Sequence, residues 1–216
     1  MIICGIDEAG RGPAIGPMVL CGFCIEEKDE HKLLDLGAKD SKLLSPKKRE
    51  ELFSILKKMA IKYDVVVLSP KEIDYALNDP TLNLNWLEAI ASAKIVNKLT
   101  PDKLIIDLPS NNKNAYVNYL KKLLIKEPII VAEHKADANY PSVSAASIIA
   151  KVNRDKEIEK IKKLVGVDFG SGYPSDPKTI DFLKNNFKKY PEIFRKTWAC
   201  FKKLNNKETQ SKLLKF

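Results

Sequence analysis

The chain has 216 residues, of which 44% are hydrophobic and 30% are charged. A chain of this length suits one domain with an appendage, and it can bury about 70% of the surface that the unfolded chain exposes. The composition therefore excludes a disordered chain, a collagen and a small disulfide-stabilised scaffold. The net charge of +9 is carried by residues 151–216, whereas residues 1–150 are neutral. A basic C-terminal third favours a polyanionic partner, although a solvated lysine-rich surface would give the same charge.

The N-terminal region has no feature of a membrane span or a signal peptide. Its longest charge-free run, Gly12–Ile25, is shorter than the roughly 20 residues that a span needs. There is no basic segment at the start, and Asp7, Glu8 and Arg11 interrupt the apolar residues. We therefore expect a cytoplasmic protein, and nothing in the sequence indicates more than a monomer.

The apolar patterns predict an α/β fold. Five short apolar segments are expected to be strands: Ile2–Asp7, Met18–Ile25, Tyr63–Leu68, Lys103–Asp107 and Pro128–Ala132. A helix is expected to begin after Ser45, which is a typical N-cap residue and is followed by proline at the first helical position. Further helices are expected at Leu84–Leu99, Ala115–Leu124, Ser142–Leu164, Thr179–Lys188 and Lys196–Leu204.

The order of these elements predicts a mixed sheet. The first two strands follow each other without a long helix, so the first three strands are expected to form an antiparallel meander. Strands four and five each follow a helix, which favours parallel crossovers. Helices are then expected on the faces of the sheet.

Four cysteines are present, and two of them form the pair Cys21-Gly-Phe-Cys24. This spacing can indicate a redox pair or half of a zinc site. The pair lies in a predicted strand, however, where residues three apart point to opposite faces. We expect these cysteines to be small buried hydrophobic residues.

Acidic residues stand where three of the predicted strands end. Asp7 and Glu8 end the first strand, Asp107 ends the fourth, and Asp137 follows the fifth. If these strands are parallel, their C-terminal ends meet at one edge of the sheet, where ligands bind in open α/β folds. Consecutive strand residues face opposite ways, so Asp7 and Glu8 reach one site only if the strand breaks there. Gly10 and Gly12 are expected to supply that break.

A cluster of carboxylates needs a cation, because adjacent carboxylates repel each other. The only histidines are His31 and His134, so a hard cation bound by oxygen is expected: Mg²⁺, with Mn²⁺ as a substitute. Two ions about 4 Å apart can clamp a phosphodiester and activate a water molecule. A single aspartate at a strand end is also common as a turn or helix cap, and this alternative stays open for each residue.

The ordered series of motifs resembles one family, the archaeal form of ribonuclease HII. The resemblance runs from residue 1 to about Trp198. The motifs that carry it are Gly5-Ile-Asp-Glu-Ala-Gly-Arg-Gly-Pro13, Asp40-Ser-Lys42, Asp107, His134-Lys-Ala-Asp137, Ser144-Ala-Ala-Ser-Ile-Ile-Ala-Lys151, Arg154-Asp155 and Gly170-Ser-Gly-Tyr-Pro-Ser-Asp176.

The resemblance implies a ribonuclease H-like fold and a metal-dependent endonuclease. The fold would be a mixed five-stranded sheet flanked by helices in residues 1–170, with a helical C-terminal extension in residues 171–209. The enzyme would hydrolyse the RNA strand of RNA/DNA hybrids. It would also cut 5′ of ribonucleotides embedded in duplex DNA, as in ribonucleotide excision repair and DNA replication. The products would carry 3′-hydroxyl and 5′-phosphate ends.

The resemblance also implies roles for individual residues. The catalytic, metal-binding carboxylates would be Asp7, Glu8, Asp107 and Asp137, with Asp107 placed by its strand and not by a long motif. Gly10-Arg11-Gly12 would recognise the 2′-hydroxyl that separates RNA from DNA. Tyr173 would stack on the deoxyribose after the ribonucleotide, and Lys42 would lie near the scissile phosphate. The alternatives are an ordinary glycine turn, a tyrosine that anchors a loop and a solvated lysine.

The last seven residues, 210–216, resemble a sliding-clamp-binding peptide. Gln210 would fill one pocket of the clamp, and Leu213 and Phe216 would fill another. The tail departs from the fuller pattern because it has one terminal aromatic residue where many such peptides have two. A frayed tail is the alternative.

The basic residues of the C-terminal third have less specific interpretations. Lys151 and Arg154 are expected to face a phosphate backbone, and Trp198 is expected to pack the helical extension onto the sheet. Two other functions stay open: a nucleic-acid-binding module without catalysis, and a two-metal nuclease that acts on a different strand.

Overall fold

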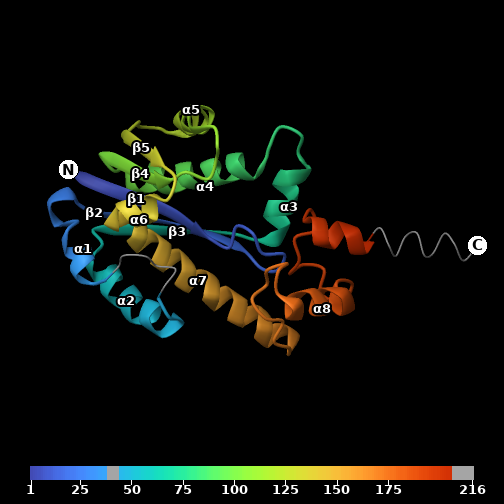
Figure 1. Cartoon of the computed structure of the whole chain (residues 1–216). Helices are drawn as coiled ribbons and strands as arrows, with labels where there is room; N and C mark the ends of the chain where they lie inside the picture. Colours follow the sequence, from blue (N-terminus) through green and yellow to red (C-terminus); the bar gives the residue numbers. More distant parts are fainter. Residues whose placement is uncertain (38–43, 206–216) are drawn as a thin grey trace, which may run out of the picture. The chain divides into compact units, whose positions relative to one another are not determined.

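The chain contains a five-stranded sheet (Figure 1), in a computed structural model that describes residues 1–37 and 44–205. The strands are β1 (Ile2–Ala9), β2 (Met18–Glu26), β3 (Lys62–Leu68), β4 (Lys103–Asp107) and β5 (Ile129–Glu133). They lie in the order β3-β2-β1-β4-β5. β1 is antiparallel to β2 and parallel to β4, and β4 is parallel to β5. The mixed α/β sheet predicted from the sequence is therefore confirmed.

Helices connect and cover these strands. Their bounds are η1 (Glu27–Asp29), α1 (Lys32–Asp35), α2 (Pro46–Met59), α3 (Pro70–Asn78), α4 (Leu84–Leu99), α5 (Lys113–Leu123), α6 (Ala136–Asn139), α7 (Pro141–Val165) and α8 (Pro177–Asn186). Residues 199–205 are also helical. The predicted start of α2 is confirmed, because the Ser45 side chain accepts a hydrogen bond from the Lys48 amide.

The chain divides into two compact units. The first contains Met1–Ala9, Val19–Val67 and Leu84–Arg154, and the second contains Gly10–Met18, Leu68–Asn83 and Asp155–Phe216. Each unit is assembled from three separate segments of the chain. The boundary at residue 170 that the motifs suggest stays a prediction.

The first unit has helices on both faces of its sheet, with α2 and the start of α7 on one face and α4 on the other (Figure 1). On one face, alternate residues of β2, including Cys21 and Phe23, pack with α2 and with the alanine-rich start of α7. On the other face, α4 lies so close to β2 that a side chain at Gly22 would meet Ile95 and Leu99. Cys21 and Cys24 are buried and belong to a regular strand, as the sequence predicted.

The second unit has a separate aromatic core. Phe182 lies at its centre, with its ring centroid 5.4 Å from that of Phe169 and 6.0 Å from that of Phe194. Ile15, from the connection between β1 and β2, belongs to the same cluster and pairs with Phe194 in an isolated antiparallel bridge. An N-terminal segment is thus built into a core made mostly of C-terminal residues.

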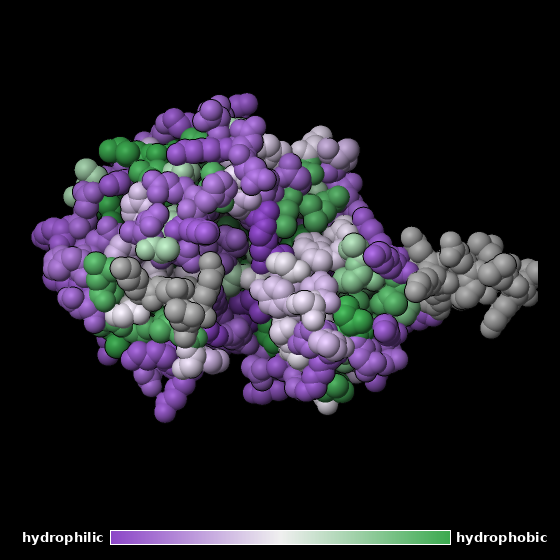
Figure 2. All heavy atoms as spheres, in the orientation of Figure 1, coloured by the Kyte–Doolittle hydropathy of each residue, from purple (hydrophilic) through white to green (hydrophobic). Residues whose placement is uncertain are grey.

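The surface shown in Figure 2 is mostly hydrophilic, and its hydrophobic side chains form small separate groups. Among the described residues, no helix is long and apolar enough to cross a membrane.

Candidate active site

Three of the four predicted carboxylates converge in the first unit. Asp7, Asp107 and Asp137 each offer an oxygen within 4.8 Å of the others. Ile6 of β1 is level with Ile106 of the parallel strand β4, so the next residue of each strand is an aspartate at the same edge of the sheet. The sequence prediction that these strand ends meet is confirmed for the three aspartates.

Asp7 is the most buried of the three carboxylates, with 6% of its surface exposed. Burial raises its pKa well above the ordinary value, and the neighbouring charges of Glu8 and Asp107 raise it further. Two hydrogen bonds oppose this effect by stabilising the ionised form: the Ser147 hydroxyl and the Glu8 amide both donate to Asp7. The carboxylate is therefore held in place and also strongly disfavoured as a bare charge.

Glu8 has a different position from the one expected. β1 stays regular through Ala9, which pairs with Val19 of β2, so the strand does not break between Asp7 and Glu8. The chain turns only at Gly10, whose φ of 81° lies in the left-handed region. The expected break at Asp7-Glu8 is wrong, because cross-strand pairing with β2 continues past both acids. Glu8 is half-buried beside Asp7, and the group of three close carboxylates does not include it.

The backbone positions Asp107 and Asp137 from a tight turn after β5. The Ala136 amide donates to Asp107 Oδ1 at 3.1 Å, and the Leu108 amide donates to the Glu133 carbonyl at 2.9 Å. Lys135 has a φ of 58°, a conformation that is uncommon for a residue with a side chain. This turn starts the one-turn helix α6, whose second residue is Asp137.

Helix α7 brings two further polar residues to the cluster. Its start lies so close to β1 that a side chain at Gly5 would overlap the backbone of Ser142. Ser147, one and a half turns further on, is fully buried and donates to Asp7, while it accepts a hydrogen bond from Lys151 Nζ at 3.0 Å. Sequence reasoning missed Ser147 because its partner lies 140 residues away, although it belongs to the Ser144–Lys151 motif.

The donor set suits a divalent cation. All three close ligands are carboxylate oxygens, which are the ligands of hard cations such as Mg²⁺ and Mn²⁺. Burial raises the pKa of Asp7, and the nearby charges of Glu8 and Asp107 raise it further. A cation between the carboxylates would offset the cost of ionising Asp7. When bound, such an ion would polarise a phosphodiester and stabilise negative charge on its oxygens.

The predicted ribonucleotide-recognition residues lie in the second unit. Arg195 is fully buried there and donates to three carbonyls of residues 10–16: Gly10 at 2.6 Å, Arg11 at 2.7 Å and Gly16 at 3.0 Å. A side chain added at Gly12 would lie 3.5 Å from the Tyr173 ring, so the turn and this tyrosine are neighbours. Sequence reasoning missed the role of Arg195, because an arginine near a basic tail is usually solvated.

The other predicted residues include four outside the described part of the chain. Lys42, Gln210, Leu213 and Phe216 fall in residues 38–43 and 206–216. Trp198, expected to pack the helical extension, donates its indole N–H to the Gly12 carbonyl at 3.0 Å.

Comparisons with known proteins agree on one family. The family model described as Ribonuclease HII matches residues 4–201. Ribonuclease HII of Pyrococcus furiosus is 46% identical over 223 residues, which cover 100% of this chain and 98% of the relative. The relative from Methanococcus maripaludis strain C6 is 48% identical and is covered over 92% of its length.

Solved structures give the same result. The crystal structure of ribonuclease H2 from Pyrococcus horikoshii has a TM-score of 0.87 and 44% identity, and the match covers 96% of this chain and 98% of the other. A second match, to the PCNA:RNase HII complex from Archaeoglobus fulgidus, has a TM-score of 0.83 and 39% identity and covers 92% of this chain and 96% of the other. The chain therefore belongs to the ribonuclease HII family of ribonuclease H-like endoribonucleases, which use divalent metals to cut the RNA of RNA/DNA hybrids.

Proposed function

We propose that this chain cuts the RNA strand of RNA/DNA hybrids and also cuts 5′ of single ribonucleotides in duplex DNA, leaving 3′-hydroxyl and 5′-phosphate ends. The observation that carries the proposal is the convergence of Asp7, Asp107 and Asp137 within 4.8 Å. Such a cluster suits a two-metal mechanism with Mg²⁺ or Mn²⁺, in which Glu8 completes the set of ligands.

The residues of the first unit have distinct tasks in this proposal. Asp7 would ligate the cation from a fixed orientation, because Ser147 and the Glu8 amide restrain its carboxylate. Asp107 is restrained in the same way by the Ala136 amide. Restrained ligands reduce the reorganisation needed when the substrate phosphate arrives.

The residues of the second unit would supply specificity. The Gly10–Gly12 turn would read the 2′-hydroxyl through its backbone, and Tyr173 beside it would stack on the following sugar. Lys42 would lie near the scissile phosphate. The surplus of basic residues in 151–216 would hold the duplex, so binding is expected to weaken steeply as salt rises.

The test uses one end-labelled DNA duplex with a single ribonucleotide, incubated in Mg²⁺, in Mn²⁺ and in EDTA. We expect one cut on the 5′ side of the ribonucleotide in either metal, and no cut in EDTA or in an all-DNA duplex. Asp107→Asn is expected to abolish the cut while duplex binding persists. Folded protein that binds this duplex without cutting it would refute junction cleavage, and a long RNA/DNA hybrid would then be tested.

We also propose that the tail binds a sliding clamp. The similarity to a ribonuclease HII solved in complex with PCNA supports this partner. Gln210, Leu213 and Phe216 would make the contacts, and the clamp would raise the local concentration of the enzyme on DNA during replication and ribonucleotide removal. Phe216→Ala is expected to abolish clamp binding in calorimetry while cleavage of a short duplex is unchanged. Equal clamp binding by Phe216→Ala and wild type would refute this contact.

A further inference from the structure

We propose that Arg195 and Trp198 are positioning residues that hold the Gly10–Gly12 turn in the form that distinguishes a ribonucleotide from a deoxyribonucleotide. The inference rests on the proposed function, because it concerns the turn that would read the 2′-hydroxyl. It assigns a task to two C-terminal residues that lie more than 180 positions away from the turn in sequence.

Arg195 provides an unusual set of contacts for a charged residue. Its side chain is fully buried, and its guanidinium donates to the carbonyls of Gly10, Arg11 and Gly16 at 2.6–3.0 Å. Burying a charge is unfavourable unless the charge is well hydrogen-bonded. A buried arginine whose side-chain nitrogens each donate to a main-chain carbonyl therefore indicates that the position of those carbonyls matters. A neutral core residue of similar size would fill the space without fixing the turn.

Trp198 completes the set of carbonyl contacts. Its indole N–H donates to the Gly12 carbonyl at 3.0 Å, and its ring lies 4.8 Å from the Arg195 guanidinium carbon. The carbonyls of three consecutive residues, 10, 11 and 12, are therefore all drawn to this one pair of side chains. The ring also attracts the guanidinium charge that lies over it.

The consequence for the turn follows from peptide geometry. In a trans peptide unit the C=O and the next N–H point in opposite directions, and the chain has no cis peptide among its described residues. With the Gly10 and Arg11 carbonyls directed at Arg195, the amide N–H groups of Arg11 and Gly12 point away from it. Gly12 is an exposed residue, so a ligand can approach the turn there. In the proposal, the N–H groups of Arg11 and Gly12 would donate to a hydroxyl or phosphate oxygen of that ligand.

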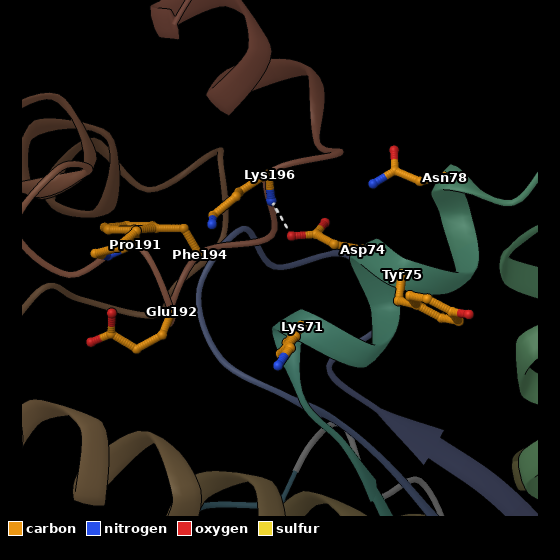
Figure 3. A pocket seen from close by; sticks show the side chains of 8 residues that line it. All are labelled: Lys71, Asp74, Tyr75, Asn78, Pro191, Glu192, Phe194 and Lys196. Carbon is orange, nitrogen blue, oxygen red and sulfur yellow. Dashed lines mark hydrogen bonds between the residues drawn. The ribbon is translucent and has the colours of Figure 1, made fainter.

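The segment that carries both residues is itself held by hydrogen bonds to Asp74 (Figure 3). Asp74 of α3 accepts from the Lys196 amide at 2.8 Å, from the Thr197 amide at 2.9 Å and from the Thr197 hydroxyl at 2.7 Å. Asp74 and Lys196 border a pocket of about 420 Å³ that Phe194 and Pro191 also line. The Arg195 amide donates to the Ala14 carbonyl, so main chain and side chain both hold residues 10–16.

The test separates positioning from stability with two conservative variants. Arg195→Lys keeps the charge but loses the fork of donors, and Trp198→Phe keeps the ring but loses the N–H that binds Gly12. Both are compared with Phe182→Leu, which destabilises the same unit through its aromatic core. Binding is measured in an Asp107→Asn background, for a duplex with one ribonucleotide and for the matched all-DNA duplex.

We expect the ratio of the two affinities to fall about tenfold in Arg195→Lys and several-fold in Trp198→Phe, while Phe182→Leu keeps the wild-type ratio. KM for the ribonucleotide duplex should rise in the active background of the first two variants. An unchanged ratio in folded Trp198→Phe would overturn the inference even if Arg195→Lys fails to fold. Absence of ribonucleotide-dependent cleavage by wild type is a different result, because it refutes the proposed function on which the inference rests.

Discussion

Gly5 offers the sharpest test of how the first unit is built. It lies in the middle of β1, two residues before Asp7, and an added Cβ would overlap backbone atoms of Ser142 and Val143 at the start of α7. Backbone cannot rotate aside as a side chain can, so Gly5→Ala requires α7 to move away from β1. Ser147 lies on α7 and donates to Asp7, so this movement weakens the support of a candidate metal ligand.

The loss of stability in Gly5→Ala can be estimated from this backbone overlap. Overpacking of a dense core typically costs 1–3 kcal/mol in the free energy of unfolding, and a backbone overlap belongs at about 3 kcal/mol. For a chain of this size, about 1 kcal/mol lowers Tm by roughly 2–4 °C, so we expect a fall of about 6–12 °C. Cleavage of the single-ribonucleotide duplex is expected to fall about tenfold or more at temperatures where the variant is fully folded.

Gly22→Ala is the matched control, because Gly22 lies on the neighbouring strand but its added Cβ would meet the side chains of Ile95 and Leu99 on the opposite face. These side chains can adjust, so we expect a cost of about 1–2 kcal/mol and normal cleavage. Thermal unfolding and cleavage rates are measured for both variants. A Gly5→Ala protein with the stability and cleavage rate of wild type would refute the close approach of α7.

Three further predictions concern charge and thiols. Because burial raises the pKa of Asp7, ionised Asp7 costs stability in EDTA at neutral pH, and this cost shrinks as pH falls below the raised pKa and is gone below the ordinary pKa of an aspartate. Asp7→Asn in EDTA should therefore unfold at a higher temperature than wild type at pH 8 but not at pH 4, while losing cleavage at least about a hundredfold. Lys178 and Lys162 hold the pKa of Asp168 well below its usual range. The stabilisation from these ion pairs should be present above about pH 4 and lost on further acidification, so Asp168→Asn and wild type should converge in unfolding midpoint towards pH 2 and in high salt. A thiol reagent should label half-exposed Cys200 first, because burial excludes the reagent from Cys21 and raises the pKa of Cys21 further than that of Cys200. Mass spectrometry showing Cys21 labelled first in folded protein would contradict the buried strand.

The local pattern of apolar residues was sufficient to predict most strands of the sheet. The apolar run Lys103–Asp107 has the bounds predicted for it, because a fully buried strand needs consecutive apolar residues and a polar residue at its end. The convergence of Asp7 and Asp107 followed from strand direction alone. Helix α3 was missed, although Ser69 and Glu72 form a complete capping box, because its nine residues carry too short an apolar pattern.

Long-range contacts set the limit of sequence reasoning. Nothing near Arg195 in the sequence reveals that its partners are the carbonyls of residues 10, 11 and 16, since any residue supplies a carbonyl. The residues near Glu8 also could not show that β1 continues past it. Glycine at position 10 indicates that the chain can turn, but pairing with β2 decides that the turn begins only after Ala9.

The way the second unit is assembled has a consequence for synthesis of the chain. Residues 10–18 leave the ribosome early, whereas the side chain that binds the Gly10 and Arg11 carbonyls is residue 195. The turn cannot reach its hydrogen-bonded form until nearly the whole polypeptide has been made. An incomplete chain, or one shortened before Arg195, can contain all four acidic residues and still lack the contacts that shape the turn. Under the proposed function, such a chain would carry the carboxylates of a nuclease without its means of choosing a substrate.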